Sequence, residues 1–259
     1  MTARALTIAG SDPTGGAGIQ QDLKTFAALK VWGLSAITSI TIQDTTGVRS
    51  WEPVSANVVR AQIDAVMADI GCDAAKTGML GTTETVDAVA RAVTDHLIGP
   101  LVVDPVLSSG SGDTLSRGDL ASAVRELLLP RAALITPNTL EAAALTGLDV
   151  KTADEQKEAA VALAADGPAA VLVTGGHLEG ERVTDVLFID GDLHEISGPR
   201  VGGADIHGTG CALSAAIAAC VAKGDGVETA VRRAHALVAD AIARATKLGT
   251  GARLLEVRA

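Results

Sequence analysis

The feature that most constrains the fold is the alternation of short apolar runs with segments of helical periodicity. The apolar runs are too short for helices and favour buried strands, and they lie at 6–9, 33–43, 101–104, 134–136 and 170–174. Segments with helical spacing lie at 19–30, 56–70, 83–96, 138–146, 153–165, 211–222 and 227–246. Buried strands that alternate with helices form right-handed crossovers, so we predict an α/β fold: a three-layer αβα sandwich with a mostly parallel central sheet.

Two further features complete this expected architecture. Segments 183–189 and 193–196 flank Asp190-Gly191-Asp192, a strong turn signal, so we expect a small antiparallel hairpin. No repeat or linker interrupts the pattern, which predicts one domain over 1–259. In such sheets ligands bind beyond the carboxyl ends of the strands, and the Gly-rich and polar segments follow the strands there.

Charge and composition argue against several classes of function. Acidic residues outnumber basic ones by 31 to 21, and the resulting net charge of −10 repels nucleic acid and anionic membranes. With two Trp, two Phe and no Tyr, the chain has few rings on which nucleic-acid bases could stack. Three cysteines without CxxC spacing indicate neither disulfides nor zinc and favour a reducing, cytoplasmic compartment. The small apolar run 212–222 is too short to cross a membrane.

The first Gly-rich loop, 10–18, follows a predicted strand and precedes a predicted helix. It is not a P-loop, because Gly16 stands where that motif requires lysine. It is not a dinucleotide fingerprint either, because Gln21 stands where the third glycine would be. The glycines could also be simple turn formers, and the residues alone leave both interpretations open.

A second Gly-rich segment, 205–214, opens directly into a predicted helix. The backbone amides of Gly208, Thr209, Gly210 and Cys211 can converge there on an anion, such as a transferring phosphoryl group. The helix N-terminus is also expected to lower the pKa of Cys211, so that its thiol could accept or relay a proton. The alternative is that Cys211 only packs against the helix.

Polar residues follow two other strands. Asn138 and Glu141 start a predicted helix and could hold a hydrated divalent cation beside a triphosphate, although their spacing alone favours a capping box. Asp104 ends a strand before a proline, where it could bind a metal or cap a turn. His177 and His207 could bind phosphate, although loop histidines are more often structural.

Motifs along the chain resemble the hydroxymethylpyrimidine/phosphomethylpyrimidine kinases, which belong to the ribokinase-like family. The resemblance begins with Ile8-Ala-Gly-Ser-Asp-Pro-Thr-Gly-Gly-Ala-Gly-Ile-Gln-Gln-Asp-Leu-Lys-Thr-Phe26. It continues through 43–45, 76–80, 103–106 with 109–110, 135–138 with 141–142, 175–177 and 207–216. It therefore extends from about residue 5 to 245.

The resemblance implies a ribokinase-like kinase that uses ATP and Mg²⁺. Its relatives phosphorylate 4-amino-5-hydroxymethyl-2-methylpyrimidine and then convert the monophosphate to the diphosphate, in thiamine biosynthesis. A small-molecule substrate and a homodimer are implied as well, with no nucleic-acid or membrane partner.

The site residues carried over by the resemblance fall into three groups. Gln43 would hydrogen-bond the aminopyrimidine, with Gly10, Asp22, Met79 and Val106 around it. Cys211 would stand in the place of the catalytic base, with Gly208, Thr209 and Gly210 forming the anion hole. The nucleotide would contact Asn138, Glu141, Thr174, Gly176 and His207, and the metal Asp104 and Glu141.

Four departures from the family pattern bear on function. Thr174 replaces a common lysine, Asp205 and Asp44 each replace a common asparagine, and segment 249–259 lacks the usual Pro-Val-His ending. Two alternatives therefore accompany the pyrimidine kinase: a pyridoxal kinase of the same superfamily, and a non-catalytic pyrimidine-binding protein. The missing cation at Thr174 motivates the second, and the intact segment 208–211 speaks against it.

Overall fold

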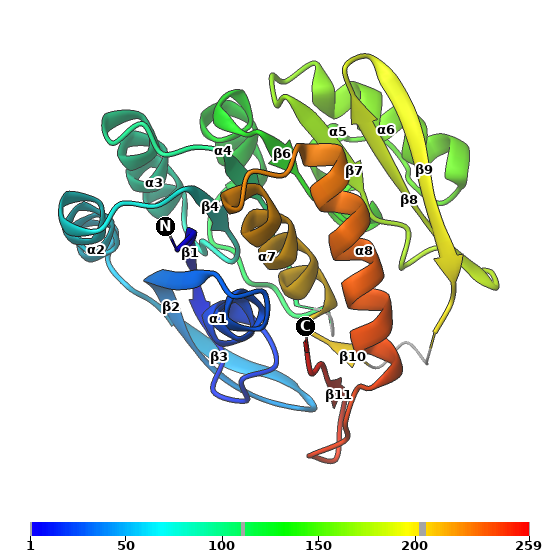
Figure 1. Cartoon of the computed structure of the whole chain (residues 1–259), viewed down its shortest axis with the longest axis horizontal. Helices are drawn as coiled ribbons and strands as arrows, with labels where there is room; N and C mark the ends of the chain where they lie inside the picture. The colour runs from blue at the N-terminus through cyan, green and yellow to red at the C-terminus, as the bar shows by residue number, and fades with distance from the viewer. Residues whose placement is uncertain (1, 110–111, 202–205, 259) are drawn as a thin grey trace.

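A nine-stranded sheet forms the centre of the computed structural model, which describes residues 2–109, 112–201 and 206–258 (Figure 1). The strands are β1 (Arg4–Ser11), β2 (Trp32–Asp44), β3 (Gly47–Pro53), β4 (Ala74–Thr77), β5 (Leu101–Val103), β6 (Leu134–Ile135), β7 (Ala170–Val173), β8 (Arg182–Ile189) and β9 (Asp192–Pro199). Their order in the sheet is β3-β2-β1-β4-β5-β6-β7-β8-β9. The run from β2 to β7 is parallel, whereas β3, β8 and β9 pair in antiparallel fashion.

Helices cover both faces of this sheet. One layer holds α2 (Ala56–Asp69), α3 (Thr83–Asp95), α4 (Leu120–Leu127), α5 (Thr139–Thr146) and α6 (Ala153–Ala164), with a 3₁₀ turn at Leu129–Arg131. The other holds α1 (Gly18–Ala28), α7 (Thr209–Ala222) and α8 (Val227–Ala243), and α7 and α8 lie in front of the strands in Figure 1. A separate parallel pair joins β10 (Ile206–His207) to β11 (Arg253–Leu254). The predicted three-layer sandwich is therefore confirmed.

Small residues let α7 sit at the centre of its layer. Every residue from Ala212 to Val221 is buried, because the helix contacts the sheet on one side and both α1 and α8 on the others. A helix that is apolar all round is typical of such a position. Its alanine content permits close approach, and the chain has few large aromatic side chains to fill a wider gap. This packing anchors the N-terminus of α7, where the second Gly-rich loop lies.

Most predicted elements are confirmed, but strands β3, β10 and β11 and helix α4 were not predicted. The β8–β9 hairpin turns at Asp190 and Gly191 as expected. Strand β3 was missed because its exposed Arg49, Ser50 and Glu52 give it little apolar signal. Helix α4 was missed because it is short, although Asp119 caps it by accepting a hydrogen bond from the Ser122 amide.

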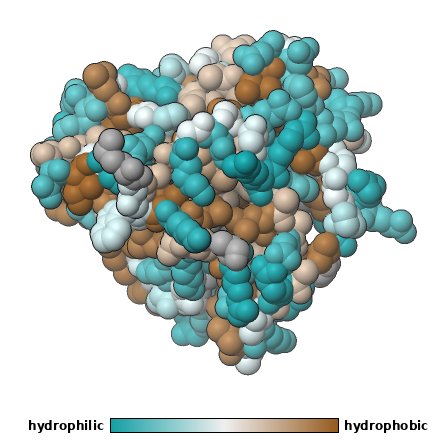
Figure 2. All heavy atoms as spheres, in the orientation of Figure 1, coloured by the Kyte–Doolittle hydropathy of each residue, from teal (hydrophilic) through white to brown (hydrophobic). Residues whose placement is uncertain are grey.

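The surface mixes charged and apolar residues. Hydrophilic side chains are dispersed over the face shown in Figure 2, with smaller hydrophobic patches between them. On β2, Ile40 and Ile42 expose about half of their surface, at 48% and 52%. Within the described residues, none of the helices combines the length and the apolar character needed to cross a bilayer.

Candidate active site

The two Gly-rich loops pack directly against each other. Gly208 adopts a positive φ of 86°, and a Cβ at this position would lie 1.8 Å from the Gly16 carbonyl oxygen. Only glycine fits there. The contact brings the N-termini of α1 and α7 together. Among the described residues, neither N-cap, Ala17 or Gly208, caps its helix through a side chain. The first backbone amides of α7 therefore lack a side-chain cap and can bind an anion, whereas the Ala17 amide at the start of α1 donates to Asp12.

Cys211 lies in the first turn of α7, where the Gly18 amide donates a hydrogen bond to it. Burial is the largest influence on this thiol and raises its pKa to about 12. The Lys76 ammonium and the Gly18 amide act in the opposite direction, while the charges of Asp22 and Asp104 add to the effect of burial. The expectation of a lowered pKa is therefore wrong, because loss of solvation outweighs the helix N-terminus. In the free protein the thiol is protonated at neutral pH.

A buried ion network lies behind Cys211. Lys76 is fully buried, and its Nζ lies 3.2 Å from Asp22 Oδ1 and 3.6 Å from Asp104 Oδ2. Thr7 donates to Asp22 at 2.6 Å, and Ser214 donates to Asp104 at 2.8 Å. Buried charges persist only where they are paired and hydrogen-bonded, as these are. The network connects α1, β4 and α7 to the end of β5.

Two residues of this network bear on the sequence-based expectations. Lys76 was not predicted to have any site function. Asp22 was expected to shape the substrate pocket, and its side chain is fully buried within this network. Burial raises the pKa of this carboxyl, although Lys76 and Thr7 oppose the increase.

Asn138 and Glu141 form the capping box that their spacing favours. Asn138 Oδ1 accepts hydrogen bonds from the Leu140 and Glu141 amides at 2.9 Å, and Glu141 Oε2 accepts one from the Asn138 amide at 2.9 Å. Burial, and then the charge of Asp104, raise the pKa of Glu141 to about 8. The capping box thus holds Glu141 where it interacts with Asp104.

Two of the other predicted nucleotide residues lie near this box, and one does not. Thr174 forms a parallel bridge with Asn138, and the Gly176 carbonyl two residues later accepts a hydrogen bond from Arg200 at 2.9 Å. His207 instead places Nε2 3.0 Å from Asp12 Oδ2, which joins β10 to the first loop. His177 exposes more than a third of its surface, but the desolvation of the covered part of its ring lowers its pKa. Asp205, a departure from the family pattern, lies outside the described residues.

The predicted pyrimidine residues lie along β2 and the loops beside it. A Cβ at Gly10 would lie 2.5 Å from Ser39 Oγ and 3.2 Å from Met79 Sδ, so these three residues are adjacent. Gln43 is half-buried, and residues 39, 41 and 43 of β2 are less exposed than residues 40 and 42 between them, so Gln43 and Ser39 share the less exposed face of this stretch although the pairing with β3 shifts between Ile42 and Gln43. Val106 packs against the cluster that contains Met79.

Trp51 also belongs to this cluster, and sequence reasoning missed it. Its ring packs with Met79 and Leu115, and the Arg117 guanidinium lies 4.5 Å from the ring centroid. The register of β2 with β3 places Trp51 opposite Thr41, on the face that carries Gln43. That cross-strand register could have been found from the sequence only if β3 had been predicted.

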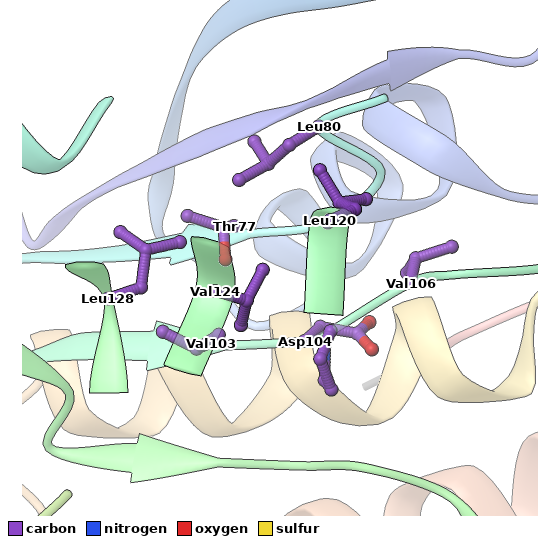
Figure 3. A pocket seen from close by; sticks show the side chains of 10 residues that line it. Thr77, Leu80, Val103, Asp104, Val106, Leu120, Val124 and Leu128 are labelled. Atoms are coloured by element: carbon purple, nitrogen blue, oxygen red, sulfur yellow. The ribbon is translucent and has the colours of Figure 1, made fainter. Parts of the chain in front are cut away.

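A small cavity lies beneath the end of β5 (Figure 3). Asp104 and Val106 lie on one side of it, and apolar residues of α4 on another. Thr77 Oγ1 is buried here and finds no hydrogen-bond partner among the described residues. The cavity has room for about one water molecule, which Thr77 could bind.

Among the described residues, no group of three or more His, Cys, Asp or Glu is arranged to hold a metal ion. Asp104 and Glu141 are nonetheless two buried carboxyl groups whose charges interact. Mg²⁺ is commonly held by one or two carboxylates together with water and substrate phosphates. These two residues therefore fit a metal that arrives with a nucleotide.

The N-terminus of α7 lies on a largely parallel α/β sheet, beside the buried polar residues of the ion network, and this arrangement suits the binding of an anion such as a phosphoryl group. The family model described as phosphomethylpyrimidine kinase matches residues 12–256. The hydroxymethylpyrimidine/phosphomethylpyrimidine kinase of Rhizobium meliloti is 50% identical over 255 residues, which cover 97% of this chain and 94% of that protein. The chain belongs to the phosphomethylpyrimidine kinase family.

Solved structures agree with this assignment. An ADP complex of Bacillus subtilis pyridoxal kinase is similar with a TM-score of 0.92 and 36% identity, covering 99% of this chain and 98% of that one. A phosphomethylpyrimidine kinase from Clostridium difficile is similar with a TM-score of 0.82 and 36% identity, covering 93% of this chain and 100% of that one. The ribokinase-like fold expected from the motifs is thereby confirmed.

Proposed function

We propose that this chain transfers the γ-phosphoryl group of ATP to 4-amino-5-hydroxymethyl-2-methylpyrimidine, and then a second phosphoryl group to the monophosphate. The observation that carries this proposal is the position of Gln43, on the strand face that also carries Ser39 beside Gly10 and Met79. An amide can both donate to and accept from an aminopyrimidine edge. The names of the curated relatives support the same substrate.

The residues 208–211 at the start of α7, which we call the anion loop, supply the electrostatics of the proposed reaction. The hydroxymethyl oxygen attacks the γ-phosphorus of ATP as the bond from that phosphorus to the bridging oxygen breaks and ADP leaves, while the backbone amides of Gly208, Thr209 and Gly210 stabilise the negative charge on the phosphoryl oxygens. Positioning and electrostatics dominate phosphoryl transfer, so a strong base is not required. We assign to Cys211 the role of orienting the attacking hydroxyl group. It can accept the proton only where bound substrate and cations lower its pKa of about 12.

The nucleotide and its metal are proposed to lie beside α5. Asp104 and Glu141 would hold Mg²⁺, and Asn138 and Thr174 lie next to each other at the edge that would face the nucleotide. Bound Mg²⁺ would neutralise phosphate charge. The ADP complex of the Bacillus subtilis relative supports use of ATP.

Glu141→Gln separates metal binding from helix capping. Glutamine can still accept the hydrogen bond from the Asn138 amide, so the capping box survives while the charge is lost. We expect the variant to bind Mg²⁺ about 10- to 100-fold more weakly. The metal-free variant should also be more stable than the wild type at pH 8. The pKa of Glu141 is about 8 in the folded protein and lower in the unfolded chain. The folded wild-type protein therefore loses stability as pH rises from the unfolded-state pKa of this carboxyl through about 8.

Titration with Mg²⁺ in the presence of ATP, and urea unfolding at pH 5 and pH 8, measure these effects. In the wild type, Mg²⁺ affinity should increase over this pH range, because binding releases the Glu141 proton. Glu141→Ala is the matched control: it removes charge and cap together, and should cost about 1 kcal/mol of cap stability relative to Gln. Unchanged Mg²⁺ affinity in Glu141→Gln would contradict the proposed metal site.

Gln43→Ala is expected to raise KM for the pyrimidine about 10- to 100-fold, because it leaves the amino group and ring nitrogen of the substrate without partners. KM for ATP should change little, since the nucleotide is assigned to the opposite end of the site. Gln43→Glu is the matched variant, because it keeps the size and the acceptor but loses the donor. Steady-state kinetics with each substrate varied in turn measures both values, and equal increases for pyrimidine and ATP would argue against direct recognition.

Pyridoxal phosphorylation is the second candidate function. The similarity to the Bacillus subtilis pyridoxal kinase, with a TM-score of 0.92, favours it. Direct comparison of pyridoxal and the hydroxymethylpyrimidine as substrates decides between the two candidate functions.

A homodimer is proposed as well, because the exposed Ile40 and Ile42 would be covered at an interface between two copies.

A further inference from the structure

The segment Thr246–Leu254 closes into a loop beside the active site. The Thr246 amide donates to the Leu254 carbonyl at 3.0 Å, and the Leu254 amide donates to the Thr246 carbonyl at 2.9 Å. We call residues 246–254 the C-terminal strap. In Figure 1 it follows α8 at the bottom of the molecule and includes β11.

One side of the strap forms hydrogen bonds to the turn between β2 and β3. The Ala252 amide donates to the Thr45 carbonyl at 2.7 Å, and the Gly251 amide donates to Thr45 Oγ1 at 3.1 Å. A Cβ at Gly251 would lie only 1.9 Å from the Thr45 carbonyl oxygen, so no larger residue fits without movement of the backbone. Thr45 follows Gln43 by two residues. The strap thus holds the end of the strand that carries Gln43.

The other side of the strap contacts the anion loop. Strand β11 pairs with β10 so that Leu254 lies opposite His207, the residue before Gly208. The Leu254 side chain is 9% exposed, and its Cδ2 lies 2.7 Å from the position that a Cβ would take at Gly16. The hydrogen bond of His207 to Asp12 completes the contact with the first loop.

We propose that the C-terminal strap is a positioning element that holds the Gln43 end of β2 at a set distance from the anion loop. The inference rests on the proposed function, because that function assigns the aminopyrimidine to Gln43. The hydroxymethyl group and the recognised ring edge belong to one rigid molecule, so attack geometry depends on the spacing of these two protein segments. The strap is the element that bonds to both: to Thr45 on one side and to His207 through β10 on the other.

Gly251→Ala tests the proposal by pushing the strap away from Thr45. We expect kcat/KM for the pyrimidine to fall about 10- to 100-fold, because small displacements of bound groups have effects of that size. Thr45→Ala, which removes the hydroxyl acceptor of the Gly251 amide together with the γ-methyl group, should act in the same direction with a smaller effect and without a clash. Gly226→Ser is the matched control at a glycine with open space around it, and it should keep wild-type kinetics.

A double-mutant cycle distinguishes positioning of Gln43 from general destabilisation. In a Gln43→Ala background, Gly251→Ala should have much less effect on KM for the pyrimidine, because the group that the strap positions is already missing. Thermal unfolding of each variant confirms that it is folded. The proposed role of the strap would be overturned if Gly251→Ala had a wild-type KM for the pyrimidine, or if Gly251→Ala raised this KM by the same factor with and without Gln43. Turnover by the wild type would still uphold the proposed function in either case. Absence of turnover by the wild type would overturn both.

Discussion

Replacement of Cys211 by alanine is expected to lower kcat for the pyrimidine about 10²- to 10⁴-fold, the usual contribution of a group that manages proton transfer or orientation. The fold should persist, because alanine is small and is well tolerated within a helix. The lost atom is the sulfur, which accepts from the Gly18 amide beside the anion loop. Steady-state kinetics with a thermal unfolding control measures the effect, and normal turnover would reject any role of Cys211 in the reaction.

The variant Cys211→Ser tests whether the sulfur of Cys211 orients the hydroxyl group or accepts its proton. If Cys211 orients the hydroxyl group, Cys211→Ser should retain more activity than Cys211→Ala, because its oxygen can also accept a hydrogen bond. The thiol pKa of about 12 further predicts that kcat/KM shows no thiol ionisation between about pH 6 and 9. An ionisation in this range that disappears in Cys211→Ser would mean that the free enzyme uses a thiolate.

Lys76→Met is expected to have the largest effect on stability. It leaves Asp22 and Asp104 buried without the ammonium that lies 3.2 and 3.6 Å from them. Removing one partner of a buried ion pair commonly costs about 3–5 kcal/mol of unfolding free energy. The pKa of Asp22, already raised by burial, should rise further, so the variant should lose stability as pH rises and that carboxyl is forced to ionise.

Urea unfolding at pH 5 and pH 8 measures this loss. The double variant Lys76→Met/Asp22→Asn is the matched control, because it removes one negative charge together with the positive one, and Asn can still accept from Thr7. It should recover part of the lost stability at pH 8. Wild-type stability of Lys76→Met at pH 8 would show that the network contributes nothing to the fold.

Most of the layered fold was predictable because most of its strands and helices carry their own local signal. The buried run at β7 and the turn at Asp190 and Gly191 are examples, since hydrophobic periodicity and turn chemistry act within a few residues. Strand β3 lies at the edge of the sheet and carries exposed polar residues, so its signal is weak. The capping box of Asn138 and Glu141 could also be predicted from the sequence, because the two residues lie only three positions apart.

The electrostatics of the site could not be predicted in the same way. Lys76, Asp22 and Asp104 lie on different elements, and only the folded chain places them together. The pKa of Cys211 depends on how much solvent that packing excludes, which a helix N-terminus in the sequence does not reveal. The strap depends on contacts between Gly251 and Thr45, which are also distant in the sequence.

Product analysis tests the central claim most directly. The purified protein is incubated with Mg-ATP and, separately, with the hydroxymethylpyrimidine, its monophosphate and pyridoxal, and products are identified by phosphorus NMR or mass spectrometry. We predict a monophosphate and a diphosphate from the alcohol, and the diphosphate from the monophosphate. Pyridoxal phosphate as the sole product would contradict the proposed function in favour of the second candidate, and absence of any product would contradict both.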